Sequence, residues 1–354
     1  MKTPPIVLAK PLEQIDRVFV EHHGRKLVYF GGCDYFRLAS HPAMLKAAAD
    51  MLNGGLNVAA SRVTTGNHPL YEELEAALAR FFKIQQALLA PTGYAANLII
   101  AQALGGKFSH AMIDERAHPS LKDATRFLDC PVFQYKHRDA AHVAQTIARC
   151  GPGAKIILLT DGVFAHDGSV TPLPDLLKPL QHDALLLLDD AHGAGVLGKN
   201  GRGTMEYFGV SDPRIVRTIT LSKAFGAYGG AVLADKRLCN AIISRSEIFI
   251  GSTPPPLPMV AAALEALSLL VTDRSLRGRL NANLKRIGKD VPIISVASKT
   301  TAEAERLTKR LLKAGIFPSF IRYPNGPATG YFRFAISSEH TPEQIDNLLS
   351  AIGQ

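Results

Sequence analysis

The chain has 354 residues, of which 47% are apolar and 20% charged. This length exceeds one ordinary domain and the composition is that of a globular protein, which excludes a disordered or fibrous chain. The formal net charge of +9 has two interpretations, nucleic-acid binding or a basic surface that favours anionic substrates. We expect the second and no nucleic-acid partner, because the basic residues are spread out and are not interleaved with aromatic residues.

The sequence also argues against a membrane span, a secretory signal and a metal site. No apolar run approaches the roughly 20 residues that cross a bilayer, and the start Met-Lys-Thr-Pro-Pro does not have the pattern of a signal peptide. The four cysteines are scattered and form no CxxC pair. We therefore expect a soluble, cytoplasmic protein without disulfides or a bound metal.

In chain order, residues 12–23 have apolar residues at helical spacing and predict a short amphipathic helix, and 26–30 predict a strand. Short apolar runs then alternate with helical patterns such as 70–82 and 94–104. Such runs are typical of strands that are buried on both faces of a mainly parallel sheet. These strands are expected at 87–90, 111–114, 155–160, 184–189 and 216–221.

The pattern changes near residue 270. A basic helix, a strand, a second helix, another strand and a last helix are expected at 271–287, 293–296, 301–314, 331–337 and 342–352. The alternation before this point predicts an α/β/α domain with ligands at the carboxyl ends of its strands, and the segment after it predicts a smaller α+β domain. We expect an N-terminal helix and strand segment over 1–36, a large domain over 37–270 and a small domain over 271–354.

Three features at predicted strand ends indicate chemistry. One strand ends at Asp189 and is followed by His192; a carboxylate there could keep a pyridine ring protonated. A second strand ends in a turn with hydroxyls and Lys223, as a Schiff-base lysine requires. A third is followed by Gly93 and Tyr94 at a helix start, whose backbone N–H groups suit a phosphate.

Each feature alone is weak. The Asp-x-x-His pair also fits a metal site or a structural hydrogen bond, a Ser-x-Lys sequence is common, and a glycine at a helix start is commoner still. Their order along the chain is more specific, because it matches one known family.

The chain resembles the α-oxoamine synthases, which are fold-type I pyridoxal-phosphate (PLP) enzymes. The family includes 8-amino-7-oxononanoate synthases, 2-amino-3-ketobutyrate CoA ligases, 5-aminolevulinate synthases and serine palmitoyltransferases. The resemblance covers almost the whole chain. The matching residues include Asp34, Tyr35, His41, Ser61, Arg62, Gly66, Asn67, Glu75, Gly93, Tyr94, Asn97, His118, Ser120, Asp161, Phe164, Asp167, Gly168, Asp189, His192, Gly198, Lys223, Thr253, Arg333, His340 and Thr341.

The resemblance implies a role for each matching site residue. Lys223 corresponds to the lysine that holds the cofactor and moves the α-proton, and Asp189 to the partner of the pyridine nitrogen. His118 would stack on the ring and His192 would bind the ring oxygen. The remaining roles concern the phosphate and the substrates. The phosphate would be bound by Thr220, Gly93 and Tyr94, together with Thr253 of a neighbouring subunit. Arg333 would bind the amino-acid carboxylate, and Ser61 would line the acyl pocket.

The same residues keep ordinary structural interpretations. The histidines could be hydrogen-bonded loop residues, Arg333 an arginine at a domain interface, and Thr220 and Thr253 caps or turn residues. Ser61 could equally be an ordinary loop serine.

Four positions depart from the family pattern. Cys33 stands where many members have asparagine, Ala165 stands for a serine that contacts the cofactor, and His166 is next to it. Tyr71 stands where a histidine often precedes Leu-Glu. These departures leave the acyl group undetermined.

The resemblance implies a homodimeric acyltransferase with active sites at the subunit interface. It would condense an amino acid with an acyl-CoA or acyl carrier protein thioester, with loss of CO2, to an α-amino ketone. We expect the 8-amino-7-oxononanoate type, with L-alanine and a pimeloyl thioester, as in biotin biosynthesis. Other α-oxoamine synthases that use glycine or serine, an aminotransferase of the same fold and a non-catalytic partner subunit remain alternatives.

Overall fold

The computed structural model describes residues 8–322, 327 and 329–354. Tertiary contacts divide the chain into two compact units. The larger unit consists of Pro42–Phe164 and Val170–Thr272, and the smaller unit of the residues before Pro42, Ala165–Ser169 and Asp273–Gln354. The division expected from the sequence, at residues 36 and 270, stays a prediction, since compactness alone does not show which segments fold independently.

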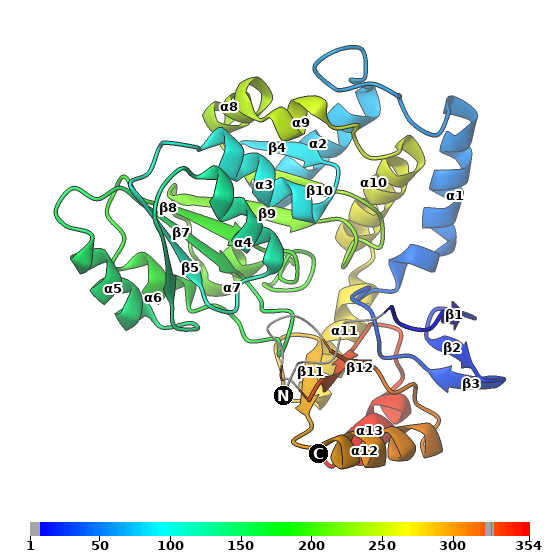
Figure 1. Ribbon diagram of the computed structural model, residues 1–354. Coiled ribbons are helices and arrows are strands. Elements are labelled where there is room, and N and C mark those ends of the chain that lie inside the picture. Colours follow the sequence, from blue (N-terminus) through cyan, green and yellow to red (C-terminus); the bar gives the residue numbers. More distant parts are fainter. Residues whose placement is uncertain (1–7, 323–326, 328) are drawn as a thin grey trace. The chain divides into compact units, whose positions relative to one another are not determined.

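Among the described residues, the larger unit holds a sheet of seven strands in the order β4-β10-β9-β8-β7-β5-β6 (Figure 1). β10 is antiparallel to both of its neighbours, and the other neighbouring pairs are parallel. The strands are β4 (Gln86–Ala90), β5 (His110–Asp114), β6 (Val132–Tyr135), β7 (Ile156–Asp161), β8 (Leu185–Asp189), β9 (Ile215–Thr220) and β10 (Gly230–Ala234). The predicted mainly parallel sheet is confirmed.

The apolar residues of the central strands supply both faces of this sheet. Along β7, Ile157 and Leu159 pack in one core cluster, and Ile156 and Leu158 pack in another. Side chains point alternately to the two faces of a strand, so a continuously apolar run requires cover on both sides. Residues of α3 (Gly93–Ala103), α4 (Pro119–Ala124), α8 (Lys236–Arg245) and α9 (Glu247–Gly251) belong to the first cluster, and residues of α5 (Ala140–Arg149) and α6 (Leu173–Leu177) to the second.

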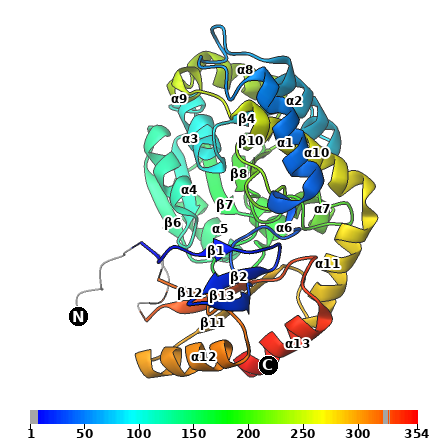
Figure 2. The same cartoon turned by 90° about the vertical axis from the view of Figure 1, so that its right-hand side faces the viewer.

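Three further helices of the larger unit pack side by side (Figure 2). They are α1 (Pro42–Met51), α2 (Pro69–Phe82) and α10 (Leu257–Thr272). The short helix α7 (Thr204–Phe208) follows β8 in the chain. No helix in the described part of the chain is long and apolar enough to span a membrane.

The smaller unit combines two small sheets with three helices within the described residues. The strands β11 (Ile293–Ala297), β13 (Tyr331–Ala335) and β12 (Phe320–Ile321) form one antiparallel sheet. The helices are α11 (Arg274–Arg286), α12 (Thr301–Lys313) and α13 (Pro342–Ile352). At the start of α13, Thr341 and Gln344 form a capping box that satisfies free N–H groups of the first turn.

The helix predicted over 12–23 is wrong. This segment contains β1 (Glu13–Gln14) and β2 (Phe19–His22), and β2 pairs antiparallel with β3 (Arg25–Val28). His23 and Gly24 form the two-residue connection, with φ angles of 52° and 70°. A tight hairpin turn of this kind requires positive φ at both positions, so the turn, and not the apolar spacing, decides the local structure.

Candidate functional site

Parallel strands of the larger unit bring their last residues together at one edge of the sheet. Asp161 at the end of β7 lies opposite Asp189 at the end of β8, and Asp189 lies opposite Thr218 near the end of β9. Thr220, the last residue of β9, lies opposite Gly230 of the antiparallel strand β10. Sequence positions almost 60 residues apart therefore meet as the parallel topology predicts.

Asp189 is held by a fully buried asparagine. Asn97 of α3 donates from Nδ2 to Oδ2 of Asp189 over 2.7 Å and to the Ser120 hydroxyl over 2.9 Å. Its Oδ1 accepts a 2.7 Å hydrogen bond from the Thr218 hydroxyl. The backbone N–H of Ala191 donates to the other Asp189 oxygen over 3.1 Å. The carboxylate is thus buried and fixed in orientation.

His118 belongs to the same network. Its Nδ1 lies 2.7 Å from the Ser120 hydroxyl, and its backbone N–H donates to Asp161 over 2.9 Å. Burial lowers the pKa of His118, the Asp189 charge opposes this and the Lys223 charge adds to it. A lowered pKa favours the uncharged imidazole, whose flat face suits stacking on an aromatic ring.

Asp161 is a buried carboxyl group beside a second one. Burial raises the pKa of Asp161 well above its usual range, the Asp189 charge raises it further, and the His118 N–H and the Lys223 charge oppose the rise. Proton uptake at Asp161 would avoid two adjacent buried negative charges.

Lys223 follows β9 in a tight turn. The N–H of Gly226 donates to the Lys223 carbonyl over 2.9 Å, and the N–H of Ala227 donates to the Leu221 carbonyl over 2.8 Å. The lysine is partly buried, and its charge acts on both His118 and Asp161. The structure therefore brings Lys223, His118 and Asp189 together.

The start of α3 approaches the end of β9 very closely. A Cβ on Gly93 would lie 2.7 Å from the Thr220 Cβ, and one on Gly230 would lie 2.5 Å from the Gly93 nitrogen. Thr92 caps the helix by accepting from the Ala95 N–H over 3.0 Å. Helix starts present N–H groups without intrahelical partners, so the first turn of α3 and the Thr220 hydroxyl form a compact anion cradle.

His192 lies in the glycine-rich loop after β8 and is buried. The neighbouring Asp190 fixes this loop by accepting from the Thr204 hydroxyl over 2.6 Å and by lying 3.8 Å from the Arg217 guanidinium. Burial raises the pKa of Asp190 to about 6, although Arg217 and Thr204 oppose the rise. Asp190 is therefore a structural anchor of the loop that carries His192.

Ser61 and Thr253 lie outside this network. The Ser61 hydroxyl donates to the Ile250 carbonyl, and Thr253 is exposed three residues farther along the chain. Tyr71, one of the departures from the family pattern, is buried and donates to the Pro255 carbonyl over 3.0 Å. It ties the loop that follows Thr253 to α2.

Arg333 is buried on β13 of the smaller unit. Its Nε donates to the Ala165 carbonyl over 2.6 Å, and its Nη1 donates to the Gly32 carbonyl over 3.2 Å. Nη2 lies 3.6 Å from the Cys33 sulfur. Two positions that depart from the family pattern, Cys33 and Ala165, thus contact the same guanidinium. The neighbouring ring of His166 lies 4.3 Å from the Tyr331 ring, measured between centroids.

The sequence alone indicates no role in the site for four of these residues, Asn97, Ser120, Asp161 and Thr218. Asn97, Ser120 and Asp161 are all among the residues that match the family pattern, and Asp161 ends an apolar strand as Asp189 does. That similarity was an available signal for Asp161. No sequence pattern shows that the Asn97 side chain reaches Asp189, because the two residues are 92 positions apart. The described residues contain no cluster of His, Cys, Asp or Glu that could hold a metal ion.

Comparisons with known proteins identify the family of this chain. The family model for aminotransferase class I and II matches residues 30–352. The 8-amino-7-oxononanoate synthase of Methylobacillus flagellatus is 35% identical, covering 96% of this chain and 90% of that protein. The enzyme of the same name from Thioalkalivibrio sulfidiphilus is 36% identical, covering 93% of this chain and 88% of that protein.

Two solved structures are similar over nearly the whole chain. Serine palmitoyltransferase from S. paucimobilis, with bound PLP-myriocin aldimine, has a TM-score of 0.88 and 26% identity, covering 96% of this chain and 90% of that chain. The 8-amino-7-oxononanoate synthase of Francisella tularensis has a TM-score of 0.78 and 26% identity, covering 92% of this chain and 96% of that chain. This chain therefore belongs to the aminotransferase class I and II family, and within it to the α-oxoamine synthases.

Proposed function

We propose that this protein is a PLP-dependent acyltransferase that condenses L-alanine with a pimeloyl thioester, as an 8-amino-7-oxononanoate synthase does. The observation that carries the proposal is the convergence of Lys223, His118 and Asp189 beside the anion cradle at the start of α3. Relatives of that name at 35% and 36% identity support the choice of substrates.

The residues present fit PLP. A buried, oriented carboxylate at Asp189 suits a protonated pyridine nitrogen, and the cradle of Gly93, Tyr94 and Thr220 suits a phosphate. When bound, the cofactor supplies an electron sink for negative charge at the substrate α-carbon. His118 in its uncharged form would stack on the ring, and His192 would hydrogen-bond the ring oxygen.

The other steps belong to the chain's own groups. Lys223 would hold the cofactor, and its Nζ would remove and return the α-proton of the substrate. Asp189, which Asn97 fixes in orientation, would keep the proton on the ring nitrogen. Arg333 binds the substrate carboxylate with its forked donors, and Ser61 lines the acyl pocket. A bond forms between the α-carbon and the thioester carbonyl carbon, the thiol leaves, and CO2 is lost.

We also propose a cytoplasmic homodimer in which Thr253 of each subunit reaches the phosphate in its neighbour. The exposure of Thr253 in this chain supports that role. The tie from Tyr71 to Pro255 would hold the Thr253 loop in place.

The deciding experiment measures release of free thiol from acyl thioesters. Pimeloyl-CoA, pimeloyl carrier protein and acyl-CoAs of other lengths are each paired with L-alanine, glycine and L-serine. We expect release that requires L-alanine and a pimeloyl donor, and a fall of at least about 10³-fold in Lys223→Ala, since this change removes both the attachment point and the base. If no pair releases thiol while amino acids still change the cofactor absorbance, the aminotransferase alternative replaces this proposal.

A further inference from the structure

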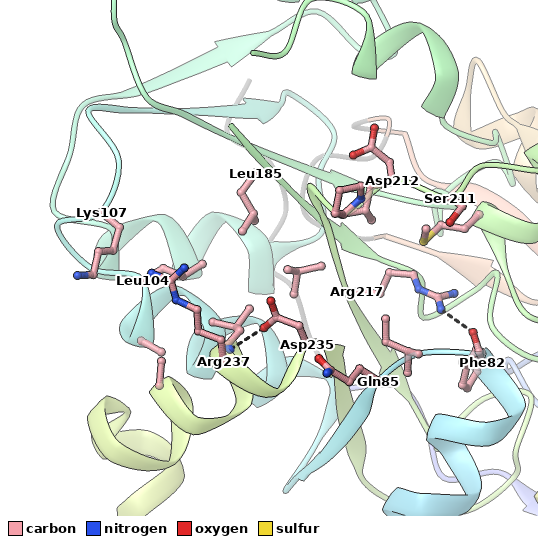
Figure 3. A pocket seen from close by; sticks show the side chains of 18 of the residues that line it. Phe82, Gln85, Leu104, Lys107, Leu185, Ser211, Asp212, Arg217, Asp235 and Arg237 are labelled. Carbon is pink, nitrogen blue, oxygen red and sulfur yellow. Dashed lines mark hydrogen bonds between the residues drawn. The ribbon is translucent and has the colours of Figure 1, made fainter. Parts of the chain in front are cut away.

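A cavity of about 1090 Å³ lies at the other edge of the sheet of the larger unit (Figure 3). It is lined where β8 and β9 begin, by Leu185 and Ile215, and where α3 ends, by Leu104. Leu185 and Asp189 are the first and last residues of β8, about 13 Å apart at the usual rise of a strand. The cavity is therefore separate from the site around Lys223.

The wall of the cavity is largely apolar. Its apolar residues come from the end of α2 and the turn after it, from α3 and the loop after it, from β8 and β9, from the segment around α7 and from α8. Those that keep partial exposure are Ile84, Leu104, Phe108, Leu185, Met205, Val210 and Ala241. Partly exposed apolar side chains gathered in a concave surface are typical of ligand pockets, and the volume lies just above the usual range of about 300–1,000 Å³.

Most acidic residues of the wall already form hydrogen bonds or ion pairs within the protein. Glu206 accepts from Asn200 and Arg202, and Asp212 pairs with Arg214 at 2.7 Å. Asp235 caps α8 by accepting from the Leu238 N–H over 2.7 Å. Asp183 is the remaining acid of the wall and is exposed.

Several exposed basic residues of the wall stand against the single remaining acid, Asp183. In the part of the chain that the structure describes, Lys107, Lys155, Arg237 and Arg245 are exposed and form no side-chain ion pair. Arg237, Ala241 and Arg245 recur at intervals of four along α8, so they share one face of that helix. Lys107 lies beyond the end of α3, so the exposed cations of the wall come from separate elements (Figure 3).

We propose that this cavity binds an amphipathic monoanion, an unbranched acyl chain that ends in a free carboxylate. The chain would cover the apolar wall, and the carboxylate would lie among Lys107, Arg237 and their basic neighbours. An apolar wall with unpaired cations at its margin complements such a ligand in both polarity and charge.

Because the sequence contains no tryptophan, a single introduced tryptophan can report ligand binding by its fluorescence. Phe108→Trp places one tryptophan in the cavity wall, and the holoenzyme is titrated with dodecanoate below its micelle concentration. We expect a saturable change in fluorescence, with dodecanol, the uncharged analogue, binding at least about tenfold more weakly. Val132→Trp, on β6 and outside the cavity wall, should give no saturable change.

Charge reversal provides the second part of the test. Lys107→Glu with Arg237→Glu, in the Phe108→Trp background, should weaken dodecanoate binding at least about tenfold. The pair Lys136→Glu and Arg149→Glu changes the net charge equally at exposed positions outside the wall and should leave binding unchanged. Lys223→Ala should also leave it unchanged.

Three results would overturn the proposal. Equal binding of dodecanol and dodecanoate would exclude recognition of the anion. Equal weakening by both reversed pairs would mean that only the net charge attracts the ligand. Loss of binding in Lys223→Ala would place the ligand at the catalytic site instead.

Discussion

Asn97 is the residue on which the orientation of Asp189 depends. It is fully buried, and its amide connects Asp189, Ser120 and Thr218 through hydrogen bonds of 2.7–2.9 Å. Ser120 in turn contacts Nδ1 of His118. One amide therefore fixes two groups that we assign to the cofactor.

Asn97→Ala should lower kcat/KM about tenfold to a hundredfold, because a hydrogen bond to a charged group contributes about 1.5–3 kcal/mol. The distinguishing measurement is the pH dependence of the cofactor absorbance. A less strongly oriented Asp189 should hold the ring proton less tightly and shift that titration to lower pH.

Ser120→Ala is the matched control, since it removes the contact to His118 but leaves the bond between Asn97 and Asp189. Ser120→Ala should leave the pH dependence of the cofactor absorbance unchanged. An unchanged titration in Asn97→Ala, with only a lower melting temperature, would reduce Asn97 to a packing residue.

His340 in the smaller unit is a buried neutral histidine. Its Nδ1 accepts from the Ser337 N–H over 2.9 Å, its Nε2 lies 3.1 Å from the Tyr29 carbonyl oxygen, and its ring stacks on Phe30 at 4.1 Å. Burial lowers the pKa of His340 to about 3, helped by the charge of Arg37, although the bond to Tyr29 opposes it.

This lowered pKa predicts a loss of stability in acid. Below pH 6.5 the unfolded chain binds a proton at this position and the folded chain does not, so the free energy of unfolding should fall from pH 6.5 toward 3. Between pH 6.5 and 5 this one group should contribute a loss of about 1.5 kcal/mol. Urea unfolding at each pH, compared with His340→Gln, isolates the effect; parallel pH profiles for the two proteins would contradict it.

At the scale of elements, the contact between α3 and β9 forms the anion cradle. Gly93 has no positive φ angle, so its requirement for glycine is spatial rather than conformational. The Thr220 side chain occupies the space that a Cβ would need.

Gly93→Ala should therefore weaken PLP binding by about tenfold or more, because α3 must move away from Thr220. The control is Gly278→Ala in α11, where a Cβ would meet nothing within 4 Å. That change should raise the free energy of unfolding by about 0.5–1 kcal/mol. PLP binding and stability of both variants are measured by cofactor titration and thermal unfolding. Equal PLP affinity in Gly93→Ala and Gly278→Ala would refute the spatial argument.

At the scale of the whole molecule, the proposed dimer requires each site to use residues of two subunits. Lys223→Ala and Thr253→Glu should each lower activity strongly, the second because a carboxylate beside the phosphate repels it. Unfolding the two variants together and refolding them as a mixture should restore activity. A mixed dimer has one site with both native residues, so about a quarter of the wild-type activity is expected from random pairing.

Each variant treated alone in the same way is the control and should stay inactive. Failure of the mixture to regain activity, with dimers present by sedimentation, would mean that Thr253 serves its own subunit.

The mainly parallel sheet could be predicted from the sequence, because continuously apolar runs must be covered on both faces wherever they occur. The sequence also determined the motifs around Gly93, Asp189 and Lys223, since these stand at strand ends that a parallel topology brings to one edge. It did not reveal the edge strand β6, which is short and mostly exposed, or the antiparallel β10, which is short and rich in glycine and alanine.

The N-terminal hairpin and the partners of the buried polar residues depend on tertiary packing. The hairpin at His23 and Gly24 replaced a predicted helix because two positive φ angles outweigh apolar spacing. Asn97 became part of the site through a contact across 92 residues, and Arg333 acquired partners at Gly32 and Ala165. Local patterns encode which face of an element is apolar, whereas the partner of a buried polar side chain depends on how distant elements pack.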